Sequence, residues 1–274
     1  MDFVQKPDFI ATDVDGTLLN RSESITLRTC EVIQAAILSN TTFVLATGRP
    51  PRWILPIVEN LGFAPIAICA NGSVVYDSYT GHIVLAHTFL YDLLEEIIEI
   101  VTYIIPDAEL FVEQVGNSIS ESSTLYLISK SSSTYHKTKA EKKELFLKDI
   151  AKLSIIKLLI YKQDAKSADI INRLSKYVKL RASITYSINN GLVEVVPLYI
   201  NKATGITQFI KYTKLSIKKS ISFGDMPNDI PMLKWASVGV AMRNSHSKVI
   251  KIANEITSSN YEDGVAVMLE RWWN

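Results

Sequence analysis

The chain has 274 residues, 47% of them hydrophobic, which is enough for a large core in one big domain or two modest ones. Lysine and arginine number 29 against 28 aspartate and glutamate residues, and this net charge of +1 argues against nucleic-acid or membrane binding. Two cysteines without a CxxC pair, no signal-peptide pattern and no uninterrupted apolar span predict a cytoplasmic protein.

The first third of the chain alternates short apolar runs with helical patterns. Residues 9–12, 41–47 and 65–70 form apolar or β-rich runs that predict strands. Between them, apolar residues recur at helical spacing through 27–37, and 52–62 is compatible with a second helix. Strand, helix, strand, helix, strand is the order typical of a parallel sheet covered by helices.

The last quarter resumes this alternation. Its pattern predicts a helix over 203–213, a strand over 220–223, a short helix over 230–236, a strand over 238–242 and a terminal helix over 263–273. The two ends of the chain are therefore expected to build one sheet together.

The middle of the chain follows a different pattern, in which β-like runs outnumber helices. The predicted helices are 91–103 and 168–178, and the β-like runs are 109–115, 124–129, 154–161 and a hairpin over 183–197. Within the hairpin, Asn190-Gly191 predicts a two-residue turn. The polar stretch 129–143 predicts a mobile loop leading into a helix.

These patterns predict an α/β fold in which a Rossmann-like parallel-sheet core carries an inserted α+β cap domain. The core would comprise residues 1–82 and 197–274, and the cap residues 83–196. The joins fall near 78–82 and near Pro197.

Two aspartates, Asp13 and Asp15, follow the first predicted strand directly. In parallel sheets the ligand crevice lies beyond the carboxyl ends of the strands, and residues i and i+2 of an extended chain point the same way. Both carboxylates can therefore face one site, where a divalent cation would remove their repulsion. Gly16 would allow a sharp turn, although an Asp-Gly pair is also typical of an ordinary surface turn.

A second acidic cluster follows the strand predicted over 220–223. Asp225 and Asp229 lie there with Asn228 beside them. A small number of carboxylate oxygens suits Mg²⁺, which keeps several waters and takes other ligands from substrate phosphate. Asn228 or Asp229 could equally cap the next helix, and capping is compatible with metal binding.

Two further positions suit an anion. Thr47 and Gly48 follow the second predicted strand, where a hydroxyl and open backbone N–H groups can bind phosphate. Lys202 precedes a predicted helix. A lone lysine is usually solvated, and this one gains interest because the other groups require a cation at the phosphate.

The segments DVDGTLL, TGR, a single lysine and GDMPND occur in this order. They resemble the four motifs of the haloacid dehalogenase-like hydrolase superfamily. With NGSVVYD at 71–77, the chain is more narrowly similar to the Cof-type phosphatases, which carry a large cap after the third core strand. The similarity covers roughly residues 8–85 and 192–268, and the cap matches in size and element order only. Arg243 stands where the family usually has glycine, and this cation could narrow the entrance or contact substrate.

The resemblance implies a role for each motif residue. Asp13 resembles the nucleophile that becomes an aspartyl phosphate, and Asp15 resembles the acid that protonates the leaving alcohol and later acts as base toward water. The groups that would hold Mg²⁺ are Asp13, the backbone carbonyl of Asp15, Asp225 and Asp229. The groups that would hold the phosphoryl oxygens are Thr47, the amides of Val14 and Gly48, Lys202 and Asn228.

The expected function is therefore a Mg²⁺-dependent phosphatase that acts on phosphate monoesters of small metabolites. One alternative is a phosphotransferase or phosphomutase, which passes the phosphoryl group to another alcohol. A less favoured alternative is a phospho-aspartate signalling domain, which would be a single short α/β domain without a large insert. The sequence indicates neither the oligomeric state nor the substrate, for which sugar phosphates, pyridoxal phosphate and flavin mononucleotide stay open.

Overall fold

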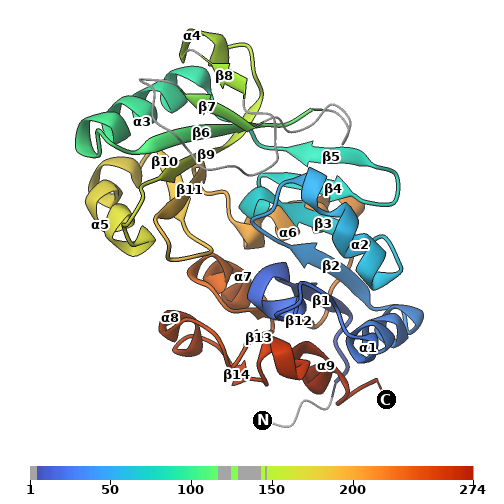
Figure 1. Ribbon diagram of the computed structural model, residues 1–274. Helices are drawn as coiled ribbons and strands as arrows, with labels where there is room; N and C mark the ends of the chain where they lie inside the picture. The colour runs from blue at the N-terminus through green and yellow to red at the C-terminus, as the bar shows by residue number, and fades with distance from the viewer. Residues whose placement is uncertain (1–4, 117–124, 129–142, 146, 274) are drawn as a thin grey trace. The chain divides into compact units, whose positions relative to one another are not determined.

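The computed structural model of the protein describes residues 5–116, 125–128, 143–145 and 147–273. It divides the chain into two compact units, Met1–Gly81 with Asn201–Asn274 and His82–Ile200. These are called the first and the second unit, and both are shown in Figure 1. Residues 129–142 of the predicted polar loop lie outside the described residues.

The first unit is built on a parallel-rich sheet with the strand order β14-β13-β12-β1-β2-β3-β4-β5. The last strand of this sheet, β5, is made of residues that belong to the second unit. The strands are β1 (Phe9–Thr12), β2 (Thr42–Ala46), β3 (Ile66–Cys69), β4 (Val74–Asp77), β5 (His82–Ala86), β12 (Ser220–Gly224), β13 (Val238–Ala241) and β14 (Glu255–Ile256). Neighbours from β14 to β3 pair in parallel, whereas β4 runs antiparallel to β3. Sequence patterns did not predict β4, β5 or β14.

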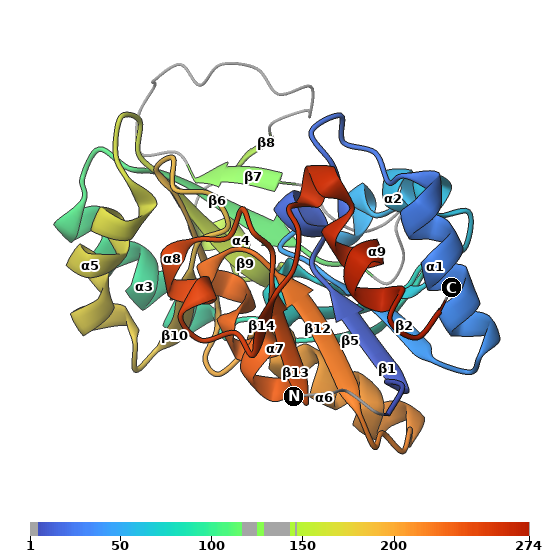
Figure 2. The same cartoon turned by 90° about the horizontal axis from the view of Figure 1, so that it is seen from below.

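Helices cover both faces of this sheet. They are α1 (Leu27–Leu38), α2 (Leu55–Leu61), α6 (Lys202–Thr213), α7 (Ile230–Trp235), α8 (Ser247–Ile250) and α9 (Gly264–Leu269). As Figures 1 and 2 show, α1 lies with α9, and α6 lies with α7 on the opposite face. Because both faces are covered, all four residues of β1 are buried, which explains its unbroken apolar run.

The second unit contains a mostly antiparallel sheet with the order β10-β11-β9-β6-β7-β8. Its strands are β6 (Glu109–Gln114), β7 (Leu125–Ile128), β8 (Lys143–Leu145), β9 (Ile155–Tyr161), β10 (Ala182–Thr185) and β11 (Leu192–Pro197). Its helices are α3 (Tyr91–Ile104), α4 (Leu147–Ile150) and α5 (Ser167–Val178). Apolar side chains of β6, β9 and β11 form one core with those of α3 and α5. The two sheets confirm the predicted fold class, a parallel-sheet α/β body and an α+β module.

The hairpin over 183–197 exists, but its predicted two-residue turn is wrong. Strand β10 ends at Thr185 and β11 begins at Leu192, so the connection is longer. The hydroxyl of Ser167 donates to Ile188 O at 2.8 Å and accepts the N–H of Gly191 at 3.1 Å. These contacts with the start of α5 hold the loop open and override the local turn preference of Asn190-Gly191.

Opposite charges are buried together within the second unit. Lys157 Nζ donates to Glu194 Oε2 at 2.9 Å, and Ser187 Oγ donates to Glu194 Oε1 at 2.9 Å. Lys157 alternates with Leu158 along β9, and Leu158 belongs to the helix-packed core. Lys157 therefore points to the other face of the sheet.

In the part of the chain that the structure describes, no helix is long and apolar enough to cross a membrane.

Candidate active site

The site begins where β1 and β12 end side by side. The two strands are parallel neighbours with Thr12 opposite Phe223, and the N–H of Asp13 donates to Phe223 O at 3.0 Å. This register brings the residues after each strand, Asp13 and Asp225, to the same edge of the sheet. Adjacent apolar strands of similar length thus place two carboxylates that lie far apart in the sequence next to each other.

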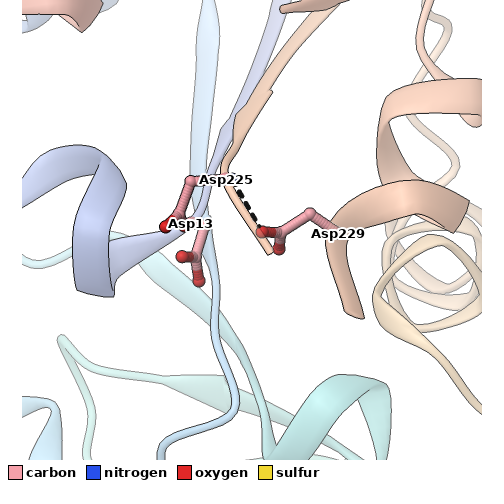
Figure 3. Close-up of side chains that lie close together, drawn as sticks. All are labelled: Asp13, Asp225 and Asp229. Atoms are coloured by element: carbon pink, nitrogen blue, oxygen red, sulfur yellow. Dashed lines mark hydrogen bonds between the residues drawn. The ribbon is translucent and has the colours of Figure 1, made fainter. Parts of the chain in front are cut away.

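Three buried aspartates gather at this edge, as Figure 3 shows. One carboxylate oxygen from each of Asp13, Asp225 and Asp229 lies within 4.8 Å of the others. Asp229 Oδ2 accepts the backbone N–H groups of Asp225 and Met226, both at 2.9 Å. Asp229 therefore holds the turn after β12, while its other oxygen is available to the cluster.

Lys202 supplies a positive charge to the three carboxylates. Its side chain is fully buried, and Nζ donates to Asp13 Oδ1 and to Asp229 Oδ1, both at 2.5 Å. Lys202 is the first residue of α6, and a capping box between Asn201 and Thr204 fixes this helix start. The helix cap therefore determines where the ammonium group lies.

The turn after β1 is shaped to fit Asp225. Gly16 has φ +75°, and a Cβ atom there would lie 2.4 Å from Asp225 Oδ2. Any side chain at this position would therefore displace the carboxylate. Thr17 Oγ1 donates to Asp225 Oδ1 at 3.2 Å, and the N–H of His246 donates to Asp225 O at 2.8 Å.

The electrostatics of the cluster are unfavourable without a further cation. Burial, followed by the charge of Asp229, raises the pKa of Asp13 well above its ordinary value. The same causes raise the pKa of Asp225 to about 7. Burial acts to lower the pKa of Lys202, but the charges of Asp13 and Asp229 and the hydrogen bonds to them raise it overall. A divalent cation with oxygen ligands would stabilise the ionised carboxylates, so these residues fit Mg²⁺.

Asp15 does not join the three carboxylates. Its side chain is half-exposed and forms a bidentate ion pair with Arg49, with Nε 2.9 Å from Oδ2 and Nη2 2.6 Å from Oδ1. The N–H of Arg49 also donates to Thr47 Oγ1 at 3.0 Å. The structure therefore separates the two aspartates of the DVD motif, one toward the cluster and one toward a guanidinium group.

The remaining predicted residues lie at the same edge or beside it. Thr47 is fully buried and follows β2, which pairs with β1 such that Leu45 lies opposite Thr12. Gly48 continues this loop, and Val14 is buried directly after Asp13. Asn228 is buried in the turn Pro227–Asp229, and its Nδ2 donates to Asn71 Oδ1 at 3.1 Å.

Three residues that the structure brings to the site have no role predicted from the sequence. They are Thr17, Arg49 and Asn71, which contact Asp225, Asp15 and Asn228 respectively. Each of these residues lies inside a segment quoted above, DGT, TGR or NGS. The sequence therefore indicates that the residue is near the site, but not which side chain it contacts. Arg243 is exposed, and its N–H donates to Ser258 O at 3.4 Å.

Comparisons with known proteins agree with this geometry. The family model for haloacid dehalogenase-like hydrolases matches residues 10–269. The 5-amino-6-(5-phospho-D-ribitylamino)uracil phosphatase YitU of Bacillus subtilis is 26% identical over 276 residues, which cover 98% of each chain.

Two solved structures share the fold over nearly the whole chain. A haloacid dehalogenase-like hydrolase from B. subtilis has a TM-score of 0.79 at 20% identity and covers 97% of this chain and 99% of its own. The subclass IIB sugar phosphatase BT4131 has a TM-score of 0.77 at 18% identity and covers 96% and 98%. With the family model spanning both ends of the chain, this protein belongs to the haloacid dehalogenase-like hydrolases and is a phosphatase of the Cof type.

Proposed function

We propose that the protein hydrolyses phosphate monoesters of small metabolites through an aspartyl phosphate on Asp13, with Mg²⁺ as cofactor. The observation that carries this proposal is the buried cluster of three carboxylates around one lysine, with a fourth carboxylate held apart from it. One group can then form the covalent bond while another moves the proton.

In the first half-reaction, a carboxylate oxygen of Asp13 attacks phosphorus. The bond between phosphorus and the ester oxygen breaks, and that oxygen leaves with the electron pair. Asp15 gives it a proton, so the product is a neutral alcohol. Asp15 must carry a proton at the start of this step, so one of its oxygens holds that proton while Arg49 donates to the other. The bidentate ion pair of the structure is the state that Asp15 reaches once the proton has left.

In the second half-reaction, water attacks the phosphorus of the aspartyl phosphate. Asp15, now ionised, takes a proton from this water, and the bond between Asp13 and phosphorus breaks. Inorganic phosphate leaves, and both aspartates return to their starting state. Transfer to another alcohol instead of water would follow the same steps, with that alcohol as the acceptor.

Positioning and charge neutralisation supply most of the rate enhancement in phosphoryl transfer. Bound Mg²⁺ would supply positive charge next to the transferring group. Asp13 and Asp225 would hold it with the backbone carbonyl of Asp15, and Asp229 would order its surroundings while it fixes the turn after β12. The phosphoryl oxygens would be bound by Lys202, Thr47, Asn228 and the amides of Val14 and Gly48.

We assign the choice of substrate to residues 83–196, the proposed cap, and the rest of the chain to the catalytic core. The buried Lys157–Glu194 pair is the candidate group within this segment, because a buried ion pair contributes little net stability and can be retained for specificity. Relatives with this fold are named as phosphatases of a phosphoribitylamino uracil and of sugars. A small polyhydroxylated phosphate ester is therefore the substrate class that we propose.

The nucleophile is tested with Asp13→Asn and with Asp92→Asn as a matched control, since Asp92 is exposed on α3. Wild type and the control should release inorganic phosphate from a panel of monoesters and yield an acid-stable phosphoenzyme in rapid-quench experiments. Asp13→Asn should do neither. A phosphoenzyme that persists in Asp13→Asn would refute the assignment, and phosphate recovered on an added alcohol would indicate transfer.

The cap assignment is tested with Lys157→Met and Glu194→Gln. Either change should alter the ranking of kcat/KM among sugar and polyol phosphates more than it alters turnover of p-nitrophenyl phosphate. An unchanged ranking in both variants would remove substrate selection from this cluster.

A further inference from the structure

The turn between β3 and β4 holds three consecutive residues in the left-handed region of the backbone. Ala70, Asn71 and Gly72 have φ values of 49°, 55° and 101°. Residues other than glycine avoid this region because Cβ crowds the following carbonyl, and such strain persists only where surrounding contacts enforce it. Backbone strain of this kind gathers at functional sites, so the contacts of the turn need an explanation.

Two backbone hydrogen bonds tie the turn to the loop after β2. The N–H of Ala70 donates to Arg49 O at 2.9 Å, and the N–H of Asn71 donates to Thr47 O at 3.0 Å. On the other side, a Cβ at Gly72 would lie 2.0 Å from Asn201 O, directly before Lys202. The turn is therefore clamped between two segments that carry proposed phosphate-binding groups.

The side chain of Asn71 extends this contact to a third segment. It is 2% exposed, and its Oδ1 accepts Nδ2 of Asn228 at 3.1 Å. Residues 71 and 228 come from opposite sides of the central strand β1, since β12 adjoins β1 on one side and β3 lies beyond β2 on the other. Asn71 thus links the loops that follow β2 and β12 to its own, the first through its backbone N–H and the second through its side chain.

Asn228 has hydrogen-bonding capacity that no described residue uses. Its Oδ1 is buried and has no hydrogen-bond partner in the part of the chain that the structure describes. An amide NH₂ group has two N–H bonds, and Asn71 takes one of them. A buried unpaired acceptor is costly, so a donor such as water is expected at Oδ1, while the second N–H of the same amide suits an acceptor such as an anion.

We infer that Asn71 is a positioning residue, which turns the amide of Asn228 so that its second N–H meets a phosphoryl oxygen. This inference rests on the proposed function. Asn71 selects one rotamer of Asn228 through this hydrogen bond, and the strained turn keeps Asn71 itself in place. The left-handed backbone is tolerated by asparagine, which explains why this residue type can fill the position.

The test uses Asn71→Gly, because glycine accepts the left-handed backbone and removes only the side chain. Asn40→Gly is the matched control, since Asn40 is exposed and also left-handed, with φ 64°. Binding of inorganic phosphate in the presence of Mg²⁺ is measured by calorimetry, without turnover. Asn71→Gly and Asn228→Ala should each weaken binding by on the order of tenfold, as expected for a hydrogen bond to a charged group. Asn40→Gly should bind like wild type.

The double variant separates positioning from a general packing effect. If Asn71 acts through Asn228, the double variant should bind phosphate no more weakly than Asn228→Ala does. Wild-type affinity in Asn71→Gly, or losses that multiply in the double variant, would overturn the inference. Wild type that binds no phosphate would instead overturn the proposed function.

A second variant covers the case in which Asn71→Gly does not fold. Asn71→Asp keeps an acceptor for Asn228 Nδ2 and tolerates the same backbone. When Asn228→Ala is added to Asn71→Asp, it should still weaken phosphate binding by the same factor as it does in the wild-type protein. An Asn228→Ala substitution without effect there would also overturn the inference.

Discussion

Removing Mg²⁺ from the protein should make its stability fall as the pH rises from 5 to 8. The carboxyl group of Asp225 is 6% exposed, and burial and the charge of Asp229 raise its pKa from 3.8 to about 7. Between these two values the unfolded chain has lost the proton and the folded chain still holds it. The folded state then binds more protons than the unfolded state, so the free energy of unfolding declines with increasing pH.

The structure also gives the size of this effect. The interval from 3.8 to about 7 corresponds to roughly 4 kcal/mol at 1.36 kcal/mol per pH unit, of which about 3 kcal/mol lies between pH 5 and 7. The contribution is fully present below pH 3.8, declines through the interval and is lost above about 7. Asp13 acts in the same direction, because burial raises its pKa too.

Urea unfolding in excess chelator at pH 5, 6, 7 and 8 measures this decline. Asp225→Asn carries no ionisable group at this position and should lose much of the pH dependence, whereas the exposed control Asp92→Asn should retain it. Saturating Mg²⁺ should restore stability at pH 8, because the cation stabilises the ionised carboxylates. A free energy of unfolding that stays level or rises from pH 5 to 8 in chelator would refute the reasoning.

Three further substitutions test the neighbours of the cluster. Arg49→Met should lower kcat/KM for alkyl phosphates on the order of tenfold or more. It should spare p-nitrophenyl phosphate, because the leaving group of this ester needs no proton from Asp15. Equal losses of kcat/KM for both esters would contradict a role of Arg49 in proton transfer. Gly16→Ala should weaken Mg²⁺ binding about 10- to 100-fold in a calorimetric titration, because the alanine Cβ displaces the carboxylate of Asp225. An unchanged affinity for Mg²⁺ would show that the Asp225 carboxylate can shift without loss of binding. Lys202→Met should cost roughly 3–5 kcal/mol in urea unfolding at pH 8, because it leaves buried carboxylates without their cation. The cost should be lower at pH 5, because the raised pKa values of Asp13 and Asp225 favour their neutral forms there. An equal cost at both pH values would exclude charge as the cause.

Local sequence patterns were sufficient for the strands β1, β2, β3, β12 and β13 and for the order of the site residues, but not for β4, β5 or β14. An apolar run such as FIAT predicts a strand wherever it lies, and β1 confirms this prediction at both ends. Patterns failed where a contact from elsewhere in the chain decides the structure. Ser167 opens the loop before β11, although Asn190-Gly191 alone indicates a tight turn.

The contacts between site residues could not be predicted from the sequence, for a related reason. The segment TGR shows that an arginine lies two residues after Thr47. It does not show that the guanidinium group of this arginine contacts Asp15, which follows the neighbouring strand β1. The segment NGS shows a turn, but not that its asparagine bonds to Asn228. A single sequence gives the residue types, whereas the partners depend on which strands become neighbours.

The position of the insert has a consequence for how the chain is made on the ribosome. Strand β1 pairs with β2 on one side and with β12 on the other, and β12 is translated only after the whole of His82–Ile200. At about 5–20 residues per second, synthesis of that segment takes on the order of 10 s. Throughout this time one edge of an apolar strand has no partner and can pair with another nascent chain. Early folding of the insert would shorten the effective distance between the two halves of the sheet, so the insert can protect the newly made core from aggregation before any substrate is met.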